Sequence, residues 1–121
     1  MRECGCDIAV IGAGPAGLAA AAAAKKQGAG RVIMIERDRL PGGILQQCIH
    51  AGFGLSYFNE ELTGPEYAGR FVENARAAGV ELMPDSMVLS ILKEGGVICS
   101  NPEHGMIRVR AGAVVLAMGC R

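Results

Sequence analysis

Tryptophan is absent from this chain of 121 residues, and aromatic residues together make up only 4% of it. The hydrophobic residues, 50% of the total, are therefore mostly aliphatic, and many of them are alanine. We expect an aliphatic, close-packed interior. A chain of this length has room for one domain with a single core.

The chain also lacks an excess of charge of either sign, because twelve basic residues balance twelve acidic ones. There is no basic run and no interleaving of basic with aromatic residues, which argues against nucleic acid or an anionic membrane surface as a partner. No membrane span is predicted either, since the apolar stretch near the N-terminus is interrupted by glycines and reaches Lys25 too soon.

Cysteine is present in a number and spacing that do not fit a disulfide framework. The five cysteines stand at positions 4, 6, 48, 99 and 120, and no signal peptide precedes them. We therefore expect a reducing, cytoplasmic location. The Cys4-Gly5-Cys6 sequence has no matching second pair, so we predict no metal site and interpret it as a frayed N-terminus.

The most informative segment is residues 7–36. An apolar run at 7–11 predicts a buried strand, and it leads directly into the G-x-G-x-x-G sequence of residues 12–17. A helix is predicted over 18–27 and a second strand over 31–35, which Glu36 closes. A strand, glycine-rich turn, helix and strand ending in an acid are typical of a dinucleotide-binding βαβ unit.

Each glycine of this turn has a predicted task. Gly12 lets the chain turn tightly, Gly14 lets the backbone approach a pyrophosphate, and Gly17 lets the helix pack closely on the sheet. The unpaired N–H groups of the first helical turn favour an anion. Glu36, 19 residues after Gly17, is placed to accept hydrogen bonds from a ribose diol. A tight turn without any ligand is the alternative.

The remaining segments predict one more helix and then mainly strands. Thr63 and Glu66 form a capping box, and Gly79 marks the end of that helix. Closely spaced turn signals between short apolar runs favour an antiparallel meander. The expected segments are an ordered, ligand-covering loop at 37–62, a strand at 80–83, a meander at about 86–110 with strands at 87–92, 97–99 and 106–109, and a buried strand at 113–117.

This order resembles the N-terminal part of the FAD-binding domain of flavoproteins with two dinucleotide-binding domains, the pyridine nucleotide-disulfide oxidoreductases and thioredoxin reductases. The likeness rests on residues 7–17 with Glu36, on the diglycine at 42–43, and on the apolar strand and glycine at 113–119. It implies an α/β fold, in which a Rossmann-like parallel βαβ sheet carries a three-stranded antiparallel meander, as in the glutathione reductase type of FAD-binding domain.

Two further stretches are similar to a narrower subgroup, found in operons for glycerol, opine or amino-acid oxidation and including hydrogen cyanide synthase subunits. They are residues 42–50 (GGILQQCIH) and 61–67 (ELTGPEY). Members of the wider family continue into an NAD(P)H-binding domain and then return to complete the FAD domain. The resemblance therefore implies that residues 1–121 are the N-terminal portion of an FAD-binding domain, without these two parts.

The resemblance implies a set of FAD-contacting residues, namely Gly12, Gly14, Pro15, Ala16, Gly17, Glu36, Arg37, Gly43, Ile44, Val88, Ala117, Met118 and Gly119. The glycine-rich turn would line the pyrophosphate, Glu36 would hold the adenosine ribose, and Arg37 would lie beside the adenine. Gly43 and Ile44 would lie near the pyrophosphate and the ribityl chain.

The other end of the expected site comes from later segments. The backbone of Val88 would face the adenine edge, and residues 117–119 would close over the cofactor. Since such side chains are often buried, Val88 and Met118 are equally interpreted as core residues.

Catalytic residues are not evident from the sequence. Disulfide reductases of one branch carry a C-x4-C pair just after the diglycine, but here those places hold Leu45 and His50, with Cys48 as a single thiol between them. Cys48 could act as a reactive thiol and His50 as a proton donor. An inert packed cysteine and a loop histidine are the alternatives.

The resemblance thus implies an FAD-dependent oxidoreductase, or its FAD-binding part, that passes electrons between a small organic substrate or NAD(P)H and an acceptor. A plain NAD-dependent Rossmann dehydrogenase is a second reading, because the first βαβ unit does not distinguish NAD from FAD. A third is a truncated, non-catalytic module that binds nucleotide or a partner subunit. A homo- or hetero-oligomer is compatible with each reading.

Overall fold

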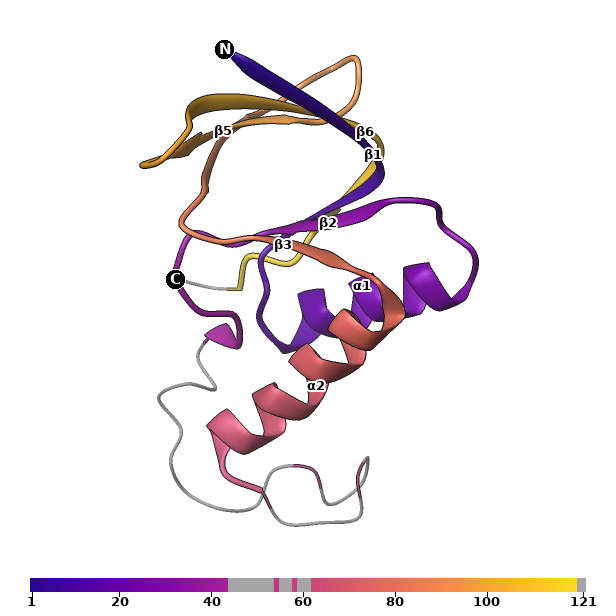
Figure 1. Ribbon diagram of the computed structural model, residues 1–121. Coiled ribbons are helices and arrows are strands. Elements are labelled where there is room, and N and C mark those ends of the chain that lie inside the picture. Colours follow the sequence, from indigo (N-terminus) through magenta and orange to yellow (C-terminus); the bar gives the residue numbers. More distant parts are fainter. Residues whose placement is uncertain (44–53, 55–57, 59–61, 120–121) are drawn as a thin grey trace.

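The computed structural model describes residues 1–43, 54, 58 and 62–119. Helices and strands alternate in the first part of the chain, and three strands follow one another in the second (Figure 1). The elements are β1 (Arg2–Ile11), α1 (Pro15–Lys26), β2 (Val32–Ile35), α2 (Gly64–Ala78), β3 (Glu81–Met83), β4 (Met87–Ile91), β5 (Val97–Asn101) and β6 (Gly105–Leu116).

All the strands join one sheet, in the order β3-β2-β1-β6-β5-β4. Its first four strands are parallel to one another, whereas β4, β5 and β6 are antiparallel neighbours. The predicted fold class, a parallel βαβ sheet with a three-stranded meander, is confirmed. The predicted ligand-covering loop at 37–62 lies mostly outside the described residues.

The strand prediction is wrong in two respects, the burial and the number of the last strands. Residues 113–117 were expected to be buried, but Ala113 and Leu116 are exposed, and Leu116 is 55% exposed. Residues 106–109 and 113–117 were expected to form two strands, but both belong to the single strand β6. Residues 105–109 of β6 pair with β5, and residues 107–116 pair with β1. The intervening Arg110 and Ala111 stay extended because Gly5 and Cys6 of β1 pair with them.

The prediction of a frayed N-terminus is also wrong, because residues 2–6 form the first half of β1 and pair with residues 107–111. Cys4 and Cys6 are partly buried and pack against an apolar cluster. Burial raises the pKa of both thiols above its usual range. Because a thiolate is the reactive form, this placement makes both cysteines less nucleophilic.

The sheet is covered differently on its two faces. Figure 1 shows α1 and α2 together on one side of the parallel strands, with β5 on the other. The helical side is closed by a cluster that includes Val10, Leu18, Ala21, Phe71 and Ala75. On the opposite side, the ends of β1 and β2 pack with meander residues, in a cluster of Ala9, Ile11, Ile33, Ile35, Val97, Cys99, Ile107 and Val109.

The second helix begins and ends where the sequence predicts. The Thr63 hydroxyl accepts a hydrogen bond from the Glu66 N–H (3.3 Å), and the Glu66 carboxylate accepts one from the Thr63 N–H (2.9 Å). Gly79 then ends α2 in the left-handed conformation, with φ of 94°. These capping bonds lower the pKa of Glu66.

Replacing Thr63 with alanine should lower the free energy of unfolding by about 1 kcal/mol, because it leaves the Glu66 N–H without its cap. The Glu66 carboxylate stabilises the fold above its unfolded pKa, and this contribution is lost as the pH falls through its lower, folded pKa. Thermal melts measure the loss in Thr63→Ala, and the difference in Tm between Glu66→Ala and the parent should shrink when these melts are repeated from about pH 7 down to about pH 3. A difference that stays constant over this range would contradict the assignment.

Candidate functional site

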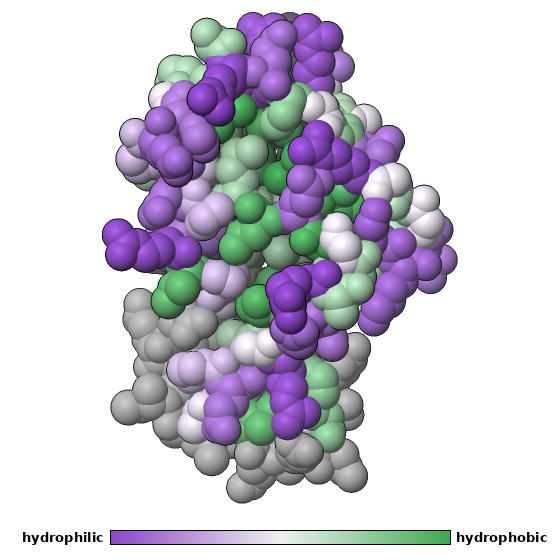
Figure 2. Space-filling model, in the orientation of Figure 1, coloured by the Kyte–Doolittle hydropathy of each residue, from purple (hydrophilic) through white to green (hydrophobic). Residues whose placement is uncertain are grey.

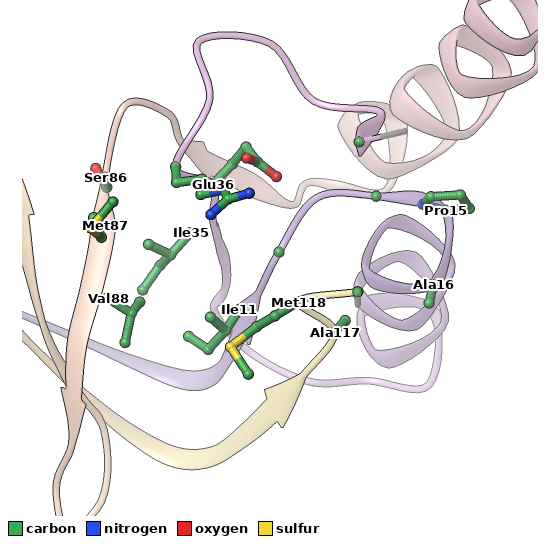
Figure 3. A pocket seen from close by; sticks show the side chains of 15 residues that line it. Ile11, Pro15, Ala16, Ile35, Glu36, Ser86, Met87, Val88, Ala117 and Met118 are labelled. Carbon is green, nitrogen blue, oxygen red and sulfur yellow. The ribbon is translucent and has the colours of Figure 1, made fainter. Parts of the chain in front are cut away.

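A pocket of about 650 Å³ lies at the carboxyl ends of β1, β2 and β6. In open α/β sheets this edge is where ligands bind. Figure 3 shows side chains from the glycine-rich turn, the end of β2, the start of β4 and the segment after β6 around one space. Figure 2 shows apolar side chains in the middle of one molecular face, bordered by polar ones. The lining residues are Ile11, Gly12, Gly14, Pro15, Ala16, Ile35, Glu36, Arg37, Gly43, Ser86, Met87, Val88, Ala117, Met118 and Gly119.

The residues predicted from the resemblance to contact FAD meet at this pocket. Among those that the structure describes, all except Gly17 line it. Ile44 and the two weak catalytic candidates, Cys48 and His50, lie outside the described residues, so their roles stay predictions. The resemblance thus joined segments that lie as far apart in the chain as Gly12 and Gly119.

Sequence reasoning missed four lining residues. Ile11 and Ile35 end buried strands, so their periodicity indicated only core positions. Ser86 directly precedes the first meander strand, β4, and Met87 opens it, next to the predicted Val88. Since side chains alternate along an extended chain, Ser86 is expected on the same face as Val88 and could have been inferred from it, whereas Met87 is expected on the opposite face.

Packing inside the protein explains two of the three glycines in the turn. Gly12 has φ of 106°, and a Cβ there would lie 2.2 Å from the carbonyl oxygen of Ala117. A Cβ on Gly17 would lie 1.9 Å from the carbonyl oxygen of Gly12 and 3.4 Å from the Val10 side chain. The tight turn at Gly12 and the close packing at Gly17 are both confirmed.

The third glycine, Gly14, is different. Its φ of −77° and ψ of −172° are open to any residue, and the nearest atom that its Cβ would meet is Gly43 Cα at 4.0 Å. The diglycine approaches the turn here, and the Gly42 N–H donates a hydrogen bond to the Ala13 carbonyl oxygen (2.6 Å). Neither backbone strain nor a contact with a described residue therefore requires glycine at position 14.

The start of α1 is suited to an anion. Gly14 is its N-cap residue, no side chain caps it, and its first turn has no acidic residue. The Leu18 N–H donates to the Gly14 carbonyl oxygen (2.9 Å), while the N–H groups of Ala16 and Gly17 come too early in the helix for such partners. These donors and the helix dipole create positive potential beside the pocket.

Glu36 lies at the other end of the pocket and is only 5% exposed. One carboxylate oxygen accepts a hydrogen bond from the Ala13 N–H (2.9 Å), and the other accepts one from the Asp38 N–H (2.7 Å). Each carboxylate oxygen can accept a further bond, so Glu36 keeps capacity for hydroxyl donors. Arg37 follows it on the rim, exposed to solvent.

Other reactive groups in the described part of the chain are not arranged for catalysis. Burial raises the pKa of the Cys99 thiol, which lies in the meander core. No three histidine, cysteine or acidic residues among the described ones are grouped to hold a metal ion. No helix in the described ranges has the length and hydrophobicity needed to cross a membrane.

Comparison with protein families gives a match along nearly the whole chain. The model of the pyridine nucleotide-disulphide oxidoreductases matches residues 6–121. The chain belongs to this family. The expected family and FAD as the cofactor of the fold are thereby confirmed, while the individual contact residues stay predictions.

Individual relatives extend this result. The chain is 60% identical over 40 residues to sarcosine oxidase subunit alpha of Rhizobium meliloti (strain 1021), which is 33% of this chain and 4% of that protein. L-proline dehydrogenase from P. horikoshii matches with a TM-score of 0.82 and 25% identity, over 98% of this chain and 23% of the other. Thioredoxin reductase from Streptococcus pyogenes MGAS5005 matches with a TM-score of 0.77 and 27% identity, over 97% and 36% respectively. The chain thus spans about a third or less of these relatives.

Replacing Glu36 with glutamine should lower the free energy of unfolding by about 1–3 kcal/mol. The new amide group has one oxygen and one NH2, so either the buried Ala13 N–H or the partly buried Asp38 N–H loses this acceptor. Urea denaturation measures this change. Glu103→Gln is the control, since that side chain is 83% exposed; equal stability of the two variants would contradict the bridging role.

Proposed function

We propose that this pocket binds FAD through its adenosine diphosphate part, within an FAD-dependent oxidoreductase. FAD supplies the redox chemistry, and the protein supplies pyrophosphate capture, ribose recognition and exclusion of water. Residues 1–121 would be the N-terminal portion of the FAD-binding domain. The observation that carries the proposal is the glycine at position 14.

Gly14 supports the proposal because the described residues give no reason for a glycine there. Its backbone angles are ordinary, and a Cβ would find no atom of residues 1–43, 54, 58 or 62–119 closer than 4.0 Å. The space that a side chain would enter is the pocket beside the first turn of α1. A ligand that must approach this backbone closely explains the missing side chain, and a diphosphate suits the N–H donors that surround it.

The other residues of the pocket suit the remaining parts of the ligand. The pyrophosphate would lie over Gly14 and Ala16, and the two ribose hydroxyls would donate to the carboxylate of Glu36. The adenine would lie between Arg37 and the backbone of Val88. Residues 117–119, with the exposed Met118 side chain, would close over the cofactor.

FAD is favoured over NAD by the elements beyond the first βαβ unit. A plain Rossmann dehydrogenase continues with further strand–helix units, whereas here β4, β5 and β6 form an antiparallel meander. The family match supports the same choice. NAD therefore stands as the second candidate, favoured only by the carboxylate of Glu36, which suits any ribose diol.

The wider reaction would pass electrons between a small organic substrate or NAD(P)H and an acceptor. The name of one relative describes an oxidase subunit and that of another an amino-acid dehydrogenase. We infer a similar role here, with a small amine or amino acid as substrate and a second subunit as partner. Cys48 as a reactive thiol and His50 as a proton donor are the candidate reactive groups. We place the protein in the cytoplasm.

Replacing Gly14 with alanine should weaken FAD binding at least tenfold while leaving Tm within about 2 °C of the parent. The added methyl enters space that the ligand needs and that the protein leaves open. Flavin fluorescence titration gives the affinity. Gly69→Ala is the matched control, because Gly69 is exposed on α2 and a Cβ there also meets nothing within 4 Å.

Measurements on the parent protein distinguish FAD from NAD as the ligand. Its visible absorption spectrum and the nucleotide released on heating should identify FAD, and added FAD should raise Tm more than NAD does. A colourless protein that neither FAD nor NAD stabilises would overturn the proposed function. A Gly14→Ala variant that binds FAD like the parent would overturn the placement of the pyrophosphate.

A further inference from the structure

Asn101, at the end of β5, holds together two turns that are far apart in the sequence. Its side-chain Nδ2 donates to the Pro84 carbonyl oxygen (3.2 Å) and to the Ser86 hydroxyl (3.0 Å). Its Oδ1 accepts from the N–H groups of Glu103 (2.9 Å) and His104 (3.0 Å). Both donors and both acceptor positions of the amide are thus used.

Only half of this arrangement is needed for the hairpin between β5 and β6. An asparagine that starts a turn uses its Oδ1 for the N–H groups two and three residues ahead, and Asn101 does so. The two bonds from Nδ2 serve another segment, residues 84–86 between β3 and β4. The turn of the hairpin therefore does not account for them.

The segment that Asn101 holds is itself built around Ser86, which is 1% exposed. Its hydroxyl donates to the Pro84 carbonyl oxygen (2.9 Å), and its N–H donates to the carbonyl oxygen of Glu36 (2.8 Å). The preceding Asp85 has φ of 52°, a conformation that costs energy for a residue other than glycine. Such a conformation persists only where the surroundings fix it.

This segment leads directly into one wall of the pocket. Ser86, Met87 and Val88 line the pocket. Glu36, whose carbonyl oxygen accepts the hydrogen bond from the Ser86 N–H, lines it as well. Asn101 is not among the lining residues. Asn101 is linked to the pocket through its hydrogen bond to Ser86, and Ser86 in turn is bonded to Glu36.

We propose that Asn101 and Ser86 form a clamp that sets the adenosine end of the pocket, with Asn101 as a positioning residue. The clamp holds residues 84–88 in a strained turn, so that the backbone of Val88 and the carboxylate of Glu36 face one nucleoside at the correct separation. This inference rests on the proposed function, because it assumes that the pocket takes an adenosine diphosphate group.

Asn101→Asp tests the clamp without removing the hairpin turn. The aspartate keeps an oxygen for the N–H groups of Glu103 and His104, but it has no donor for Pro84 or Ser86. Titration calorimetry with ADP as the probe gives the affinity separately from the fraction of protein competent to bind. We expect Kd to rise about tenfold at unchanged stoichiometry. A purely structural role would change the stoichiometry or Tm but not Kd.

Two further variants complete the test. Ser86→Ala removes the hydroxyl at the centre of the clamp, and combining it with Asn101→Asp should add little to the rise in Kd, because both changes break the same linkage. Glu103→Ala is the control in the same hairpin, since its side chain is 83% exposed and outside the clamp. It should bind ADP like the parent. If Asn101→Asp does not fold, Ser86→Ala alone decides.

Amide hydrogen exchange gives a readout that needs no ligand. The Ser86 N–H, bonded to Glu36, should exchange faster in Asn101→Asp than in the parent, whereas amides in α1 should not change. Unchanged Kd for ADP in both clamp variants would overturn the inference. If the parent fails to bind ADP and FAD, the proposed function fails, and unchanged Ser86 exchange would then reject the clamp by itself.

Discussion

The buried carboxylate of Glu36 is the contact on which the rest of this site depends. Its two oxygens accept from the backbone on both sides of the pocket, one from Ala13 in the glycine-rich turn and one from Asp38 beyond β2. Its own carbonyl oxygen accepts from Ser86 at the start of the meander. One residue therefore joins three segments that border this end of the pocket, and backbone N–H groups bind both of its carboxylate oxygens.

The long strand β6 has the corresponding role for the sheet. Its first half pairs with β5 and its second half continues beside β1, so one rigid element links the meander to the parallel strands. The carbonyl oxygen of Ala117, just beyond this strand, lies 2.2 Å from the place that a Cβ on Gly12 would take. Strand pairing therefore fixes the distances between the ends of β1, β2 and β6, which border the pocket.

Local patterns predicted what local physics decides. The glycine spacing, the acid after β2 and the capping box at Thr63 each act within a few tens of residues, and each was placed correctly from the sequence. The sequence could not reveal contacts that depend on a distant partner. Residues 2–6 look like a polar terminus until β6 pairs with them, and Asn101 looks like an ordinary turn residue until Pro84 and Ser86 lie beside it.

The pairing of β1 with β6 also has a consequence for how the chain reaches this structure. Strand β1 pairs along its whole length with residues 107–116, so its main neighbour is synthesised about a hundred residues later. Local contacts such as those within α1 can form early, but closing this pair costs the entropy of ordering the whole intervening segment. Until then, one edge of β1 is exposed to pairing with other chains, and folding speed should depend on this late closure more than on either helix.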